Sequence, residues 1–334
     1  MGVSRDAAAL PMPRAATGLQ RSFLLLLGLA AALAPIWLLE GFHLFQLTVA
    51  VIMALAVLGL NIVTGFSGQI SLGHGAFFAI GAYVTAVLMA QADWSFWATL
   101  PFAAAFCGIV GYGVGLPALR LGGLYLALVT FSLAVAVPQL LKHRALEQWT
   151  GGVQGLFITK PEPPAWLPLG IDQYMYLIAV VVAGVCFWLT WNLIHSRIGR
   201  ALMATRDHPT AAEATGMDIA ALKTGAFAVS AMVTGIAGAL SAVAIEFVAP
   251  DSFTFLLSIS FFVGMVVGGV ASILGSIFGG LFVLFVPNIA ESISQAAPGV
   301  IYGMILIVFL FAMPEGIAGL LRRIARRLGW AVRN

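Results

Sequence analysis

The sequence contains very little charge. Of its 334 residues only 9% are charged, whereas 61% are hydrophobic and the mean hydropathy is +1.03. Ordinary soluble domains are about a quarter charged, so this composition excludes an ordinary soluble protein. The net charge is only +3, and the basic residues lie between apolar stretches. We therefore interpret them as membrane-topology signals and expect no nucleic-acid partner.

Lysine and cysteine are also scarce. The lysines are Lys142, Lys160 and Lys223, and none follows a glycine, so the chain lacks the Gly-Lys-Ser/Thr end of a nucleotide-binding P-loop. The sequence therefore predicts neither an enzyme nor a cofactor held by this chain. The cysteines, Cys107 and Cys186, lie in apolar stretches, where a thiol behaves as a small hydrophobic group, and we expect neither a disulfide nor a metal site.

Carboxylates are absent from the middle of every apolar stretch. All 13 acidic residues fall in loops or at the ends of these stretches. Proton- and sodium-driven carriers usually place ionisable groups in mid-membrane, so this absence argues against a carboxylate relay. The 5 histidines have no Cys, Asp or Glu partners at ligand spacing, which argues against a metal site and an intramembrane metalloenzyme.

Long apolar runs are what the sequence has in abundance. A helix of about 20 apolar residues crosses the hydrocarbon core of a bilayer. We therefore predict an all-α fold, a polytopic membrane helical bundle of about ten transmembrane helices in one domain, 1–334. The ninth run is short and could be broken or re-entrant. The runs are 23–39, 44–64, 76–91, 96–118, 123–141, 174–194, 224–246, 254–272, 276–290 and 298–314.

The basic residues orient these spans. With the first span read as an uncleaved signal anchor and the N-terminus inside, 13 of the 16 basic residues fall on the cytoplasmic side. Both termini are then cytoplasmic, with an N-terminal tail at 1–22 and a basic tail at 315–334. The polar loop 195–223 is also cytoplasmic, whereas the Gly/Pro-rich connection 142–173 lies outside.

Small residues recur at four-residue intervals in two places. Such spacing typically lets membrane helices approach closely, so we predict helix packing for Ser67, Ser71, Gly75 and Ala79, and for Gly264, Gly268, Ser272, Ser276 and Gly280. The first set lies in "TGFSGQISLGHGAFFAIGAY", residues 64–83, which also carries Gln69 and His74. His74 is either a structural hydrogen-bond partner or part of a conduit wall. With Asn61, Gln69 and Ser71 it forms our candidate set for a translocation path.

Several segments resemble one family. "GLNIVTGFSGQISLGHGAFFAIGAY", "LRLGGLYLALVTFSLA", "TGGVQGL", "GMVVGGVASILGSIFGG" and "PEGIAGLL" occur in order over about residues 55–320. They are similar to LivM-type permease subunits of branched-chain amino acid ABC importers, a family that also includes urea and amide permeases. The sequence departs from the family at Ala271 or Ser272, where a further glycine is usual.

The resemblance implies a bacterial inner-membrane complex. Its other members would be a second, LivH-like permease subunit, two LivG/LivF-like cytoplasmic ATPase subunits that bind ATP, and an extracytoplasmic substrate-binding protein, all within membrane lipid. The loop 195–223 would couple this chain to the ATPases. Pro209 and Gly216 favour a short helix at about 209–215 in that loop. The residues assigned to coupling are Arg197, Gly199, Arg200, Arg206, Asp207, Glu213 and Gly216.

The implied activity is import of leucine, isoleucine, valine or related neutral amino acids by alternating access. Three alternatives stay open from the sequence. Urea, short amides or aromatic acids could be the substrate of a permease of the same family. A self-contained channel would conduct without ATPases, and a structural membrane scaffold would conduct nothing.

Overall fold

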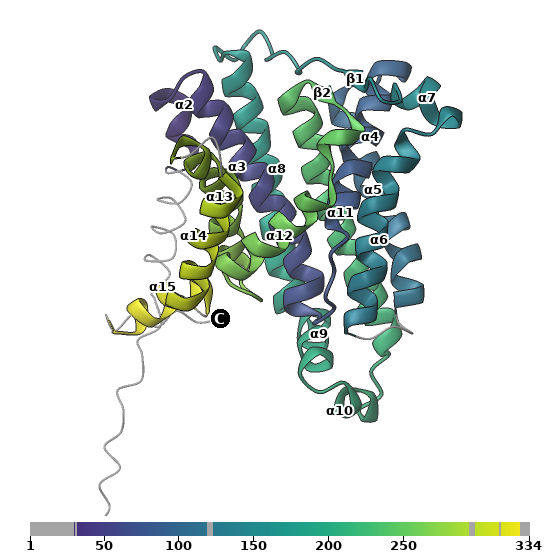
Figure 1. The fold of residues 1–334 in the computed structure, drawn as a ribbon, viewed down its shortest axis with the longest axis vertical. Helices are drawn as coiled ribbons and strands as arrows, with labels where there is room; N and C mark the ends of the chain where they lie inside the picture. Colours follow the sequence, from purple (N-terminus) through teal and green to yellow (C-terminus); the bar gives the residue numbers. More distant parts are fainter. Residues whose placement is uncertain (1–29, 31, 119–122, 294–297, 314, 328–334) are drawn as a thin grey trace, which may run out of the picture.

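The computed structural model describes residues 30, 32–118, 123–293, 298–313 and 315–327. Long helices run side by side between two ends (Figure 1). The end that carries the short strands β1 (Leu156–Phe157) and β2 (Phe247–Val248), which pair antiparallel, is called the upper end. The lower end carries the short helices α9 (Arg197–Asp207) and α10 (Pro209–Ala214).

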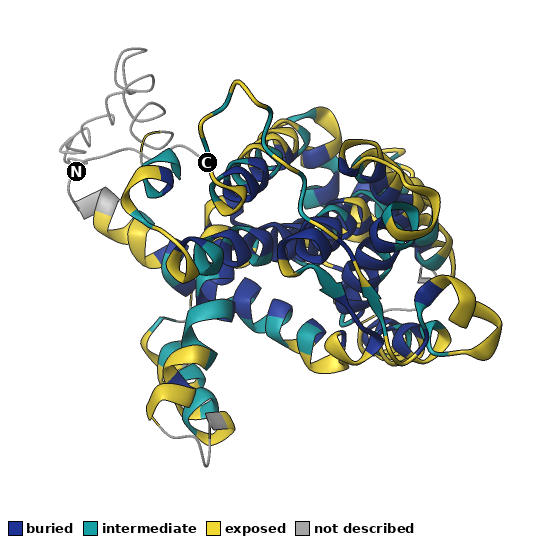
Figure 2. Cartoon of the chain, turned by 90° about the horizontal axis from the view of Figure 1, so that it is seen from above, coloured by how far each residue is buried: buried dark blue, intermediate teal, exposed yellow. Residues whose placement is uncertain are grey.

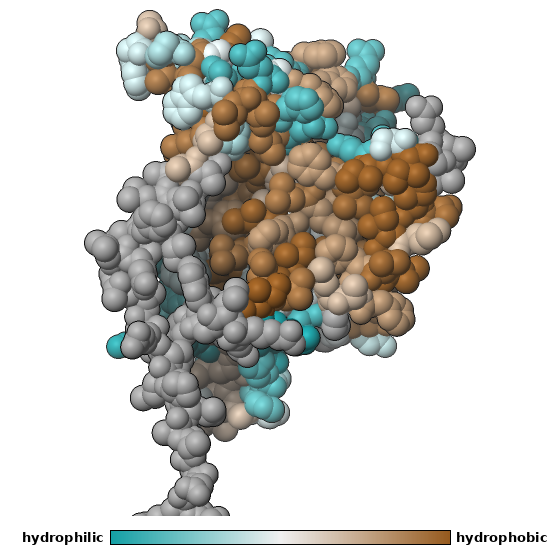
Figure 3. Space-filling model, turned by 90° about the vertical axis from the view of Figure 1, so that its left-hand side faces the viewer, coloured by the Kyte–Doolittle hydropathy of each residue, from teal (hydrophilic) through white to brown (hydrophobic). Residues whose placement is uncertain are grey.

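Eight helical segments of the described chain are long and apolar enough to cross a membrane. Figure 3 shows the corresponding apolar belt between more hydrophilic ends. The predicted all-α, multi-pass membrane fold is therefore confirmed. The segments are α3 (Phe42–Leu60) continued by the π-helix η1 (Asn61–Phe66), α4 (His74–Ala92), α5 (Phe96–Ala118), α6 (Leu124–Leu141), α8 (Ile171–His195), α11 (Ile219–Ile245), η2 (Pro250–Ser252) with α12 (Phe255–Gly268), and α13 (Ile273–Ile293).

The two ends of the chain add shorter elements. The tenth predicted run corresponds to α14 (Pro298–Ala312), a helix of only 15 residues. The first part of the first run, 23–29, and the whole tail 1–22 lie outside the described residues. Helix α2 (Pro35–Leu38) belongs to the last part of that run. Part of the predicted basic tail forms a further helix, α15 (Gly316–Arg327).

The core lies along α3, α4 and α11. Leu55, Phe77, Phe227 and Leu240 are completely buried there, and Figure 2 shows the buried residues concentrated along the middle of the bundle. Helices α5, α6 and α14 expose apolar side chains on their outer faces, as helices in contact with lipid do. The central helices thus form the rigid support for the residues at the lower end.

Ion pairs close the upper end beside the strands. The ammonium of Lys160 lies 2.9 Å from Asp172 and 3.5 Å from Glu246. Partial burial disfavours the charged ammonium, but the hydrogen bonds and charges of the two carboxylates outweigh that effect and raise the Lys160 pKa. Lys142 pairs with Asp251, and the short helix α7 (Arg144–Thr150) lies beside this end.

The eighth and ninth spans differ from their predicted boundaries. Helix α12 ends at Gly268 instead of 272, whereas the ninth span, expected to be short, is the 21-residue helix α13. The break falls between them because Gly269 has φ of 127° and Ala271 has φ of 55°, which no right-handed helix accommodates. The two helices form a hairpin with a tight turn at 269–272.

Neither of the two small-residue runs predicted to pack helices forms a single helical face. Ser67 and Ser71 lie in an irregular segment, 67–73, whereas Gly75 and Ala79 belong to α4. The second stripe is divided between α12 and α13, because the turn at 269–272 interrupts it. Close approach still occurs across this hairpin, since a methyl group added to Gly264 would lie 2.9 Å from the carbonyl oxygen of Gly279.

Ala271→Gly is expected to stabilise the chain by about 1 kcal/mol, because the left-handed backbone costs an alanine roughly that much and a glycine very little. Thermal unfolding in detergent measures the change. Ala105→Gly is the matched control, since Ala105 is an exposed residue inside α5 and should lose about 1 kcal/mol. If Ala271→Gly and Ala105→Gly changed the unfolding temperature in the same direction, Ala271 would not be strained.

Candidate functional site

The lower-end loop folds into two short helices. The Ser196 hydroxyl caps α9 by accepting hydrogen bonds from the amides of Ile198 and Gly199. Pro209 occupies the first turn of α10, and Gly216 follows this helix with φ of 82°. Proline at the start and a left-handed glycine after the end are the favoured helix boundaries. The predicted short helix at about 209–215 is thus present as Pro209–Ala214.

Five of the seven residues assigned to coupling lie exposed on this loop, among them Asp207 and Gly216. Arg197 and Glu213 are exposed, and neither side chain forms a hydrogen bond or ion pair within the described part of the chain. Arg200 donates to the carbonyl oxygen of His195 at 2.9 Å and is otherwise exposed. Gly199 is instead buried against Ile194 at the end of α8. The loop therefore presents charge of both signs below the bundle (Figure 1).

Arg206 connects this loop to the membrane bundle. Its Nη1 donates to the carbonyl oxygen of Gly65, in η1, at 2.9 Å, and its aliphatic stem lies against Gly68. Its Nε donates to Asp207 at 2.8 Å. This hydrogen bond and the guanidinium charge lower the pKa of Asp207. Among the residues assigned to coupling, Arg206 contacts the glycine-rich stretch directly.

The stretch after Phe66 stops being helical and satisfies its own polar groups. The backbone N–H of Gln69 donates to the Val63 carbonyl at 3.0 Å, and the Thr64 hydroxyl donates to the backbone carbonyl of Gln69 at 3.0 Å. A π-helix leaves the i→i+4 pattern and is frequent at functional sites. The chain can therefore leave α3 below the bundle without exposing unpaired backbone groups to lipid.

Gln69 and His74 are buried and paired with protein groups. Gln69 is 5% exposed and its Nε2 donates to Ser67 Oγ at 2.8 Å and to the Lys223 carbonyl at 3.1 Å. His74 is 1% exposed; Nδ1 lies 3.0 Å from Ser71 Oγ and Nε2 lies 2.5 Å from Ser230 Oγ. Of the two interpretations of His74, this geometry favours the structural hydrogen-bond partner.

Asn61 anchors the turn of the α12–α13 hairpin. It is fully buried, and its amide nitrogen donates to the Ser272 carbonyl at 2.9 Å and to Ser276 Oγ at 3.1 Å. Its carbonyl oxygen accepts from the Ala271 amide at 2.9 Å. Within this single chain, therefore, Asn61 faces protein groups and not an open path. The same holds for Gln69, Ser71 and His74.

Sequence reasoning missed the partners of these residues. The Thr130 hydroxyl accepts from the Leu72 amide at 2.9 Å, and the Ser258 hydroxyl accepts from the Gly75 amide at 2.8 Å. Ser230 donates to the Gly59 carbonyl at 2.6 Å and so joins α11 to α3. The available signal was a hydroxyl in an otherwise apolar span, which typically bonds across helices. That signal does not say which partner it reaches.

Charge is excluded from the interior of the described structure. Among the residues described, no Asp, Glu, Lys or Arg is buried. Over the same residues, no group of three or more His, Cys, Asp or Glu side chains is arranged to hold a metal ion. The arrangement offers a polar network for holding helices in register, and an exposed charged loop linked to that network by Arg206.

Comparisons with known proteins identify relatives of this chain. A family model described as "Branched-chain amino acid transport system / permease component" matches residues 42–313. The chain is 30% identical to the high-affinity branched-chain amino acid transport system permease protein LivM of Escherichia coli, over 94% of this chain and 78% of that protein. It is 27% identical to permease protein BraD of Pseudomonas aeruginosa, over 84% and 97%, and 28% identical to LivH of Escherichia coli, over 80% and 91%. No solved structure matches the chain.

Proposed function

This chain belongs to the family of permease components of branched-chain amino acid transport systems, and we propose that it is the transmembrane subunit of an ATP-driven importer. Its substrates are leucine, isoleucine, valine or related neutral amino acids. The lower end faces the cytoplasm of a bacterial inner membrane. The distribution of charge supports this orientation, because the described basic residues are more numerous at the lower end than at the upper.

The observation that carries the proposal is the contact of Arg206 with Gly65. It ties an exposed, charged loop outside the apolar belt to the end of a central helix within it. A movement of α9 and α10 is thereby transmitted to α3 and to the segment 67–73. We propose that α10, with Glu213 on its exposed surface, docks on a cytoplasmic ATPase subunit.

The driving force comes from partner subunits. The interior charge that a proton or sodium relay needs is missing from the described spans, so two ATPase subunits supply the energy from ATP. A second permease subunit, similar to LivH, completes the path across the membrane, and an extracytoplasmic binding protein delivers substrate at the upper end. The relatives named LivM and LivH support a pair of different permeases.

Alternating access describes the transport cycle. ATPase closure moves the lower-end loop, and the bundle then opens toward the upper end to accept substrate. A branched-chain amino acid is a zwitterion with an apolar side chain, and the described interior offers no buried ion pair to hold its two charges. Selectivity therefore resides mainly in the binding protein, and substrate affinity in the membrane path is low.

Substrate identity is tested with the assembled complex. Proteoliposomes that contain the permease pair, the ATPases and the binding protein are supplied with ATP and a panel of labelled solutes. We expect uptake of leucine, isoleucine and valine at least about tenfold above that of urea, acetamide and phenylalanine. Preferred uptake of urea or of an aromatic acid would contradict the proposed substrate but not the assignment as a permease. Tight leucine binding by the isolated permease pair would contradict the proposed low substrate affinity of the membrane path.

A further inference from the structure

Helix α15 at the lower end has a basic and an apolar side. Its sequence, "GIAGLLRRIARR", combines Arg322 and Arg323 with Leu321 and Ile324, which are each 45% exposed. Basic helices with one strongly apolar face typically lie along the membrane interface. In Figure 1, α15 follows α14 at the lower end of the bundle, at the level where the apolar belt ends. The exposed leucine and isoleucine can therefore reach acyl chains while the arginines remain near headgroups.

The beginning of α15 is fixed against the α12–α13 turn. Gly316, with φ of 71°, lies so close to Gly269 that an added methyl group would be 2.8 Å from the Gly269 Cα. Ala318 is buried at the same contact. Because Asn61 holds the turn from the other side, α15 has a defined position relative to the bundle. The space between the helix and the turn is therefore a formed feature of the fold.

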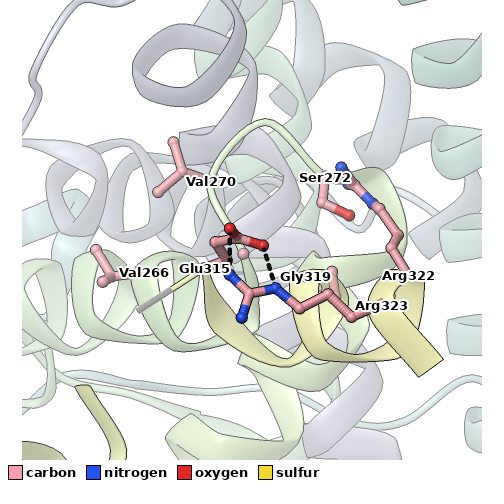
Figure 4. A pocket seen from close by; sticks show the side chains of 9 residues that line it. Val266, Val270, Ser272, Glu315, Gly319, Arg322 and Arg323 are labelled. Atoms are coloured by element: carbon pink, nitrogen blue, oxygen red, sulfur yellow. Dashed lines mark hydrogen bonds and ion pairs between the residues drawn. The ribbon is translucent and has the colours of Figure 1, made fainter. Parts of the chain in front are cut away.

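A cavity of about 380 Å³ lies in this space. Its apolar wall is made by Val266 and Val270, and Val270 is half exposed. Its polar wall carries Ser272 and Arg322. In Figure 4 the two valines lie on one side of Glu315, and Ser272 and Arg322 lie on the other. The cavity is thus amphiphilic, with a hydrocarbon surface beside a cation.

The two arginines of the cavity differ in their pairing. Arg323 forms a bidentate ion pair with Glu315, with N–O distances of 2.5 Å and 3.2 Å. The Arg322 side chain forms no hydrogen bond or ion pair within the described part of the chain. The Ser272 hydroxyl accepts from the Gly275 amide at 3.1 Å, which leaves its own hydrogen to be donated to a ligand. A guanidinium and a hydroxyl are therefore available for an anion.

We propose that this cavity binds the headgroup phosphate of an anionic phospholipid from the cytoplasmic leaflet. Arg322 and Ser272 contact the phosphate, and an acyl chain lies along Val266 and Val270. The charge of the cavity matches an anion, and the apolar wall at the edge of the membrane belt selects a lipid over free phosphate. The site is separate from the coupling contact of Arg206 with Gly65.

Native mass spectrometry of the full-length chain with added phosphatidylglycerol or phosphatidylcholine tests the site. We expect wild type to prefer phosphatidylglycerol, and Arg322→Gln to lower its affinity about fivefold, the effect of one interfacial basic residue. Arg322→Lys should retain most of the binding. Val270→Glu, which leaves Arg322 in place and adds a negative charge to the half-exposed wall, should lower the affinity at least as much as Arg322→Gln.

Arg144→Gln is the matched control, because Arg144 is an exposed arginine on α7 at the upper end. It should bind phosphatidylglycerol as wild type does. Wild-type binding by both Arg322→Gln and Val270→Glu would overturn the proposal, as would an equal loss in Arg144→Gln. Displacement of the lipid by inorganic phosphate at equal concentration would show a free-anion pocket and would also overturn it. Unfolding temperatures without lipid should be unchanged by Arg322→Gln, which separates lost binding from misfolding.

Discussion

Replacing Gly238 by alanine is expected to destabilise the bundle by at least about 3 kcal/mol. A methyl group at this position would overlap the carbonyl oxygen of Phe78 and approach the amide of Ala82 to 3.0 Å. Both obstacles are backbone atoms of α4, so no side-chain rotation can relieve them, and α4 and α11 must move apart. Overpacking of this kind typically costs 1–3 kcal/mol and costs more when the backbone has to shift.

The chain's own thiols provide the measurement. Cys107 and Cys186 are both buried, so a thiol-reactive dye reports their exposure as the protein unfolds on heating. Gly225→Ala is the control, because Gly225 lies on the same helix with no atom within 4 Å of an added methyl group. Helix propensity should raise the stability of that variant by up to about 1 kcal/mol. Equal melting temperatures for the two variants would contradict the close contact of α4 with α11.

Arg206→Ala is expected to lower ATP-dependent uptake at least about tenfold while the complex still assembles and hydrolyses ATP. The substitution removes the hydrogen bond to the Gly65 carbonyl and the stem that covers Gly68. The loop then remains docked on the ATPase but no longer moves the end of α3. Uptake and ATP hydrolysis are measured on the same proteoliposomes, because coupling is the ratio of the two rates.

Two further variants separate this contact from simple loss of charge. Arg206→Lys retains a donor and should keep an intermediate rate of uptake. Lys223→Ala removes a positive charge from the same end but leaves the Lys223 carbonyl to accept from Gln69, so its uptake should stay near wild type. If Arg206→Ala transported at the wild-type rate, or if Lys223→Ala were equally impaired, Arg206 would not be the link.

The sequence predicted the membrane spans well because hydropathy depends on local composition. The span predicted at 96–118 is α5, Phe96–Ala118, and the run 123–141 is α6, Leu124–Leu141. The short helix α10 was also predictable, because Pro209 and Gly216 are local signals. Each of these features is decided by residues that are neighbours in the chain.

Features that depend on distant contacts were not predictable in the same way. The turn at 269–272 contains Ala271 with positive φ, a conformation for which alanine gives no signal, and Asn61 stabilises it from about 210 residues away. The four-residue spacing from Ser67 to Ala79 predicted helix packing, but it did not show that the chain leaves α3 at η1 and forms hydrogen bonds to α6 and α11 before α4 begins. Periodicity alone does not distinguish a continuous helix from two helices joined by such a segment.

The central claim is that this chain is a conduit driven by separate ATPases through its lower-end loop. The most direct measurement is leucine uptake into proteoliposomes with ATP, comparing the permease pair alone with the pair bound to its ATPases and binding protein. We expect accumulation against a gradient only in the complete complex, and none when ATP is replaced by a non-hydrolysable analogue. Leucine flux through the permease pair alone at the rate of the complete complex would contradict it and indicate a self-contained channel.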